Sequence, residues 1–73
     1  MGRRSGEPII YLISVKDGED KKEIKNIVEK IKRSERKTKI INASKELGTA
    51  VIELPPNAPI HKLKKEFKFN IVV

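Results

Sequence analysis

The chain has no cysteine and no tryptophan, and its aromatic residues are one tyrosine and two phenylalanines among 73 residues. Without cysteine there is neither a disulfide framework nor a thiolate metal site, which are the usual reinforcements of very small domains. The longest apolar run, Ile9 to Ile13, is far shorter than the roughly 20 residues that span a bilayer. We therefore expect no membrane association, a cytoplasmic location, and a core built from the 11 Ile, 5 Val and 4 Leu.

Groups that carry out catalysis are also scarce. His61 is the only histidine, and no second ligand stands at zinc spacing from it. Ser14 and Ser44 have no histidine or acid at the spacing of a nucleophile motif. Gly18 and Gly48 are isolated and belong to no phosphate-binding loop. The sequence predicts a protein that is not an enzyme and that uses no metal and no cofactor.

Positive charge is in excess and is concentrated in one segment. The 17 Lys and Arg outnumber the 10 Asp and Glu, for a net charge of +7. Acidic residues at the start of a helix and basic residues at its end are favoured by the helix dipole, which explains part of this pattern. A run opposed only by Glu35 should nevertheless attract RNA or DNA phosphates, or an acidic protein surface. Its members are Lys30, Lys32, Arg33, Arg36, Lys37 and Lys39.

Hydrophobic periodicity predicts the order of the elements. Ile24, Ile27, Val28 and Ile31 form one apolar helical stripe. Residues 1–7 are expected to be a disordered tail, and residues 8–73 a single domain. The expected elements are a strand at Pro8–Val15, a helix from about 20 to 33–36, strands at Thr38–Ala43 and Gly48–Leu54, a short helix capped by Asn57 or Ala58, and a strand at Phe69–Val73.

This βαββαβ order predicts an α+β, ferredoxin-like plait, in which two helices cover one face of a four-stranded antiparallel sheet. The opposite face of such a sheet is left open. In the third strand the larger aliphatic set, with Ile52 at its centre, should meet the helices. The alternate set should face outward and is the predicted face for a protein partner; it consists of Thr49, Val51 and Glu53. The apolar last strand, Phe69–Val73, is expected to be an edge that could pair with another chain.

Three stretches of the chain resemble the N-terminal domain of NusG-type transcription elongation factors. They are Ile10-Tyr11-Leu12-Ile13-Ser14-Val15, Gly18-Glu19-Asp20-Lys21, and the segment from Ile40 to Gly48 followed by Val51-Ile52-Glu53. The resemblance implies a module that docks on RNA polymerase, or on another component of transcription or translation. It also implies that Glu53 takes part in pairing with a small zinc-binding protein.

Two other families with this plait are similar in part. Gly48 to Leu54 and Ile10-Tyr11-Leu12 resemble the two RNA-contacting strands of an RRM, although Thr49 and Val51 replace the stacking aromatics. That alternative implies a degenerate RNA-binding domain in which Tyr11 stacks on a base. The strand that ends at Leu54-Pro55 before a short helix resembles subtilisin-type propeptides, which implies a protease inhibitor or chaperone.

Overall fold

Six elements in the order βαββαβ make up the computed structural model, which describes residues 7–72. They are β1 (Ile9–Val15), α1 (Glu23–Ser34), β2 (Lys39–Ser44), β3 (Thr49–Leu54), α2 (Ile60–Phe67) and β4 (Phe69–Ile71). The strands form one antiparallel sheet in the order β2-β3-β1-β4, which confirms the predicted α+β plait. Most of the tail predicted to be disordered, and the last residue of the predicted final strand, lie outside the described residues.

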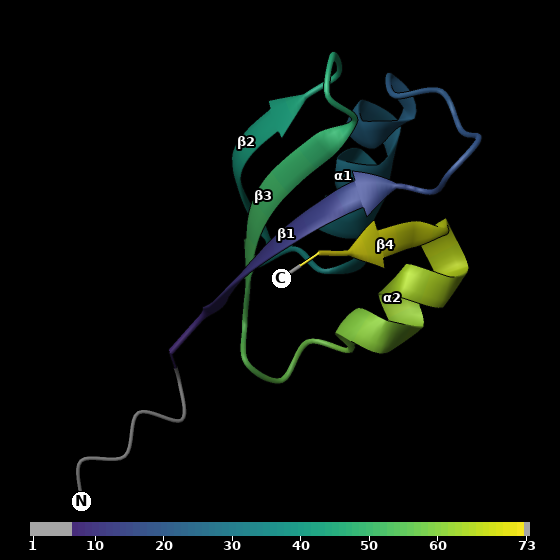
Figure 1. Ribbon diagram of the computed structural model, residues 1–73. Coiled ribbons are helices and arrows are strands. Elements are labelled where there is room, and N and C mark those ends of the chain that lie inside the picture. Colours follow the sequence, from purple (N-terminus) through teal and green to yellow (C-terminus); the bar gives the residue numbers. More distant parts are fainter. Residues whose placement is uncertain (1–6, 73) are drawn as a thin grey trace, which may run out of the picture.

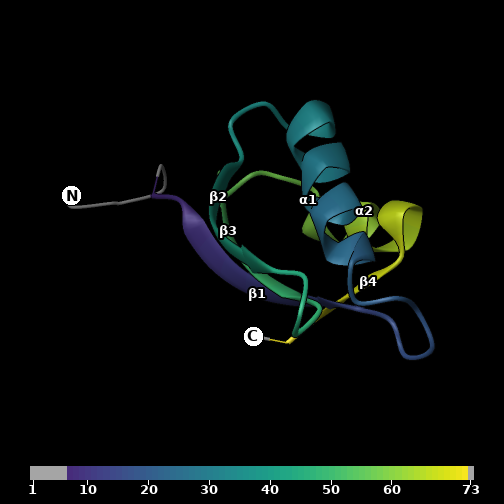
Figure 2. The same ribbon diagram turned by 90° about the horizontal axis from the view of Figure 1, so that it is seen from above.

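Both helices lie on the same side of the sheet, and the other side is uncovered (Figures 1 and 2). The core fills the space between these two layers and is aliphatic apart from Phe69. The predicted stripe of α1 is buried throughout, and Ile60 and Leu63 of α2 are buried with it. The sheet contributes Ile13, Ala50, Ile52, Leu54 and Phe69. This layer of large side chains is what a small domain without disulfides needs to be stable.

The helices begin slightly later than the sequence predicts. α1 starts at Glu23 because a separate turn precedes it: the Asp20 carboxylate accepts a hydrogen bond from the Lys22 N–H at 3.0 Å, and the Glu23 N–H donates to the Asp20 carbonyl at 2.9 Å. At α2 the cap position is held by Pro59, without a side-chain cap hydrogen bond, and not by Asn57 or Ala58. Both shifts concern one turn and leave the buried stripes unchanged.

A four-residue turn after β2 ties the hairpin to the end of β1. Gly48 closes it with a φ of 71°, and its N–H donates to the Ser44 carbonyl at 2.8 Å. The Leu47 N–H donates to the Ser44 hydroxyl at 3.2 Å. The Gly48 carbonyl in turn accepts the Val15 N–H at 2.9 Å. Gly48 therefore holds the three central strands of the sheet in register at this end.

Edge strand β2 contains a bulge at Ile41. Lys39 lies opposite Glu53 and Ile40 opposite Ile52, but the next paired residue is Asn42, opposite Val51. The extra residue places two consecutive side chains, Ile41 and Asn42, on the same side of the sheet, where both are exposed. Without the bulge the alternation of β2 would be reversed beyond this point.

Candidate binding surfaces

The sheet face that points away from the helices is the first candidate surface, and we call it the open face. The strand register arranges most of its side chains in three rows that run across the strands. With the bulge residue, its members are Ile10, Leu12, Ser14, Lys39, Ile41, Asn42, Ser44, Thr49, Val51, Glu53, Asn70 and Val72. Lys39 is the only cation and Glu53 the only anion in this set, which contains no aromatic residue.

Aliphatic side chains are prominent on the open face. The exposed fractions of Ile10, Ile41 and Val72 are 58%, 49% and 54%. Val72 extends the row of Leu12 and Val51, because its N–H donates to the Leu12 carbonyl at 2.7 Å. Exposed large apolar side chains are common singly, but a group that shares one flat face is typical of an interaction surface.

The three residues predicted for a protein partner lie on the open face as expected. Thr49, Val51 and Glu53 are half-buried, whereas the alternate residues of β3 are buried against the helices. The structure adds one feature to this set: Glu53 lies directly opposite Lys39 of β2. An opposite-charge pair across two strands contributes about 0.2–1 kcal/mol to stability. Glu53 therefore has a structural neighbour of its own, and its role towards a partner remains a prediction.

Tyr11 lies on the other side of the sheet. It is paired with Ile52, which is fully buried, and its half-buried side chain packs against the core. Residues that are directly opposite in a ladder share a face, so Tyr11 does not contribute to the open face. The stacking that an RRM performs on its open sheet has no aromatic residue available there.

The basic run between residues 30 and 39 does not form one patch. Lys30 lines a groove beside α2 together with Glu66 and Phe67. Lys32, Arg33 and Arg36 line a separate shallow hollow with Glu29. The exposed Lys37 lies in the loop after α1, and Lys39 is on the open face. The run is divided because α1 ends at Ser34 and β2 begins at Lys39, so the chain turns between them.

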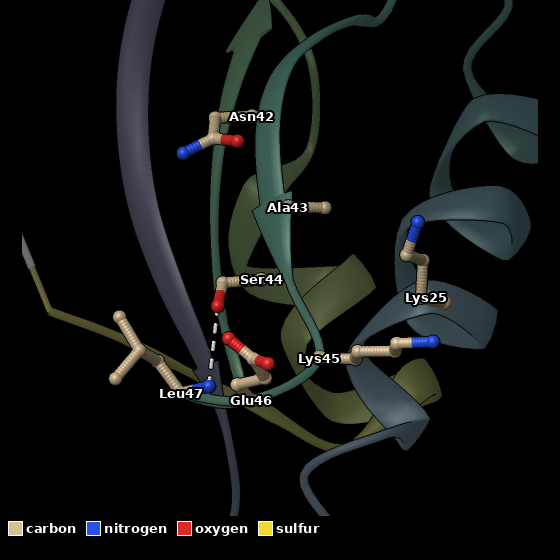
Figure 3. A pocket seen from close by; sticks show the side chains of 7 residues that line it. All are labelled: Lys25, Asn42, Ala43, Ser44, Lys45, Glu46 and Leu47. Carbon is tan, nitrogen blue, oxygen red and sulfur yellow. Dashed lines mark hydrogen bonds between the residues drawn. The ribbon is translucent and has the colours of Figure 1, made fainter.

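Two cations that the sequence analysis did not select lie close to this surface. Lys25 of α1 and Lys45 of the turn after β2 line one hollow between the helix and the hairpin (Figure 3). Figure 3 shows Ala43 and Lys45 pointing towards α1, whereas Asn42 points away from it. The two lysines are 20 residues apart in the sequence, and only the fold brings them together.

His61 is exposed on α2, as predicted. Among residues 7–72, no group of three or more His, Cys, Asp or Glu side chains is placed to hold a metal ion. No helix in this part of the chain has the length and apolar character needed to cross a membrane. Comparison of the chain with protein families, with curated proteins and with solved structures finds no match.

Proposed function

We propose that the chain is a small, non-enzymatic docking module that binds a protein through its open face. The resemblance to NusG-type domains points to RNA polymerase, or another protein of the transcription machinery, as the partner, and hence to a cytoplasmic location. One observation carries the proposal. In a chain with a net charge of +7, the open face is largely aliphatic and holds a single cation opposite a single anion.

The driving force for docking would be the removal of aliphatic surface from water. Burying apolar area stabilises a complex by about 25 cal/mol per Å², before the costs of association are subtracted. Ile10, Ile41 and Val72 are each about half exposed in the free chain and would supply most of this area. Base stacking on the same face is disfavoured because no aromatic residue lies there, so a protein partner fits this surface better than RNA.

The size of the open face sets the strength of binding. Four strands about 4.8 Å apart, with six residues rising about 3.3 Å each, cover roughly 400 Å² in projection. A standard interface buries about 800 Å² on each partner. Docking through the open face alone is therefore expected to be weak and reversible, which suits a module that joins and leaves a larger machine.

The charge pair on the open face offers a direct test. Exchanging its members in the double variant Lys39→Glu/Glu53→Lys keeps the cross-strand attraction, and thus the fold, but inverts the charge pattern that a partner meets. We expect the wild-type chain to capture RNA polymerase from a nuclease-treated extract of the source cell, and the exchanged variant to capture much less. A second variant, Val51→Asp, should also lose capture.

The matched control is Lys62→Glu, because Lys62 is exposed on α2, away from the sheet. Circular dichroism checks that all variants are folded. Undiminished capture by both open-face variants would contradict the proposal, as would capture that disappears after nuclease treatment. The latter outcome would show that nucleic acid, and not the open face, bridges the chain to polymerase.

A further inference from the structure

Basic side chains follow the flank of α1 that faces β2. Lys25, Glu29 and Lys32 stand at positions i, i+4 and i+7, which lie along one side of a helix. Arg33 and Arg36 line the same hollow as Glu29 and Lys32. Lys45 joins this flank from the hairpin, because it shares the neighbouring hollow with Lys25 (Figure 3). We call the five cations Lys25, Lys32, Arg33, Arg36 and Lys45 the basic flank.

The basic flank is extended and polar. At 1.5 Å per residue, Lys25 and Lys32 are about 10 Å apart along the helix axis. All five cations are exposed, and the acids that line the same two hollows are Glu29 and Glu46. The exposed Leu47 also borders the lower hollow, but its side chain points away from α1 (Figure 3). The flank thus offers charge along a line without an apolar group to insert into a lipid layer.

We propose that the basic flank binds the backbone phosphates of duplex nucleic acid without regard to sequence. A duplex carries one negative charge per about 1.7 Å of its axis, so a 10 Å stretch presents about six charges to the flank. Within residues 7–72 the aromatic side chains of Tyr11, Phe67 and Phe69 pack on the core. Single strands are bound tightly where their bases stack on aromatic residues, and the basic flank has none to offer.

This surface is independent of the docking proposed for the open face. The basic flank belongs to the helical layer and the hairpin turn, and the open face is the opposite side of the sheet. A duplex bound along α1 would leave the open face accessible to a protein. The exchanged variant Lys39→Glu/Glu53→Lys has an unchanged net charge and should retain duplex binding, so failure of one proposal does not imply failure of the other.

The experiment is a fluorescence-anisotropy titration of a labelled 20-base-pair DNA of random sequence with the purified chain. If the basic flank contacts about four phosphates, log affinity falls with log salt at a slope of roughly −3.6, about a hundredfold loss between 50 and 200 mM salt. Lys32→Glu/Arg36→Glu should reduce the steepness of this slope by about two. Glu29→Gln, which removes the acid from the flank, should tighten binding.

A matched control separates a local site from net charge. Lys62→Glu/Lys65→Glu changes the total charge by the same amount but alters two exposed lysines of α2. We expect it to retain most of the affinity and a slope close to that of the wild type. Equal losses in the two double variants would overturn the proposal.

Three other results would also overturn it. They are no binding of the duplex at 50 mM salt, at least tenfold tighter binding of the matching single strand, and displacement of the duplex by phosphatidylserine vesicles at lower charge concentration than by unlabelled DNA. Circular dichroism establishes that each variant is folded. Because all the substituted residues are exposed, no loss of helix or strand signal is expected.

Discussion

Gly48 is the residue at which a single added methyl group tests the packing of the hairpin against β1. A Cβ built at this position would lie 2.9 Å from Cγ of Lys21 and 3.1 Å from Cγ2 of Val15. The backbone is left-handed there, with a φ of 71°. Gly48→Ala therefore introduces two costs, a conformational one and a steric one. The conformational cost of a left-handed residue with a side chain is about 1–2 kcal/mol.

Gly18 provides a control that carries only the first cost. Its φ is 89°, but a Cβ added there would meet nothing within 4 Å. Both alanine variants also lose flexibility in the unfolded chain, which offsets about 0.4–1 kcal/mol in each. The steric cost at Gly48 is that of mild overpacking, about 1–3 kcal/mol. Lys21 is exposed and can move, but Val15 is half-buried at the end of β1, so part of this cost remains.

Urea unfolding followed by circular dichroism measures the difference. Gly18→Ala should lower the free energy of unfolding by about 1 kcal/mol or less, and Gly48→Ala by about 1–3 kcal/mol more than that. The slope against urea concentration should be the same in both variants, so that the shift of the midpoint reports stability alone. Equal midpoints for the two variants would refute the argument that close approach of Lys21 and Val15 makes Gly48 necessary.

Two further predictions concern buried side chains. Thr38 is the buried polar residue of the core layer, and its hydroxyl donates to the Glu35 carbonyl at 2.6 Å. Thr38→Val should lower the free energy of unfolding by only about 0.5–1.5 kcal/mol, because the Thr38 N–H still donates to the same carbonyl; a loss above 3 kcal/mol would contradict this. Ile52 is fully buried at the centre of the sheet, and Ile52→Ala should cost about 2–5 kcal/mol, measured by the same urea titration. A variant as stable as the wild type would show that the core can close around the missing atoms.

The sequence predicts the fold well where apolar periodicity is strong. The stripe of Ile24, Ile27 and Ile31 indicates α1, and the alternation of β3 indicates which of its residues are buried. These patterns work because each element must bury one face, and a helix and a strand do so at different spacing. The boundaries are less certain: the turn held by Asp20 and the proline cap of α2 depend on local hydrogen bonds that no periodicity records.

Two features of the candidate surfaces could not be predicted from the sequence. Apolar residues occupy both alternations of β1, so the sequence does not decide whether Tyr11 or Leu12 meets the helices. The bulge at Ile41 is similarly hidden, because Ile40 and Ile41 are equally apolar and only the pairing with β3 shows which one is extra. The basic flank was missed in part because Lys25 and Lys45 meet only after the hairpin folds back towards α1.

The uneven distribution of charge also has a kinetic consequence. Because the open face holds one cation and one anion while the cations of the basic flank are on the helical side, the chain has a strong electrical asymmetry along the axis that joins its two layers. A polyanion would orient the approaching molecule before contact, with the helices leading. Its association rate should fall steeply as ionic strength rises, whereas association of a neutral protein with the sheet should proceed at nearly the same rate. The molecule would therefore arrive already turned to present its sheet outward.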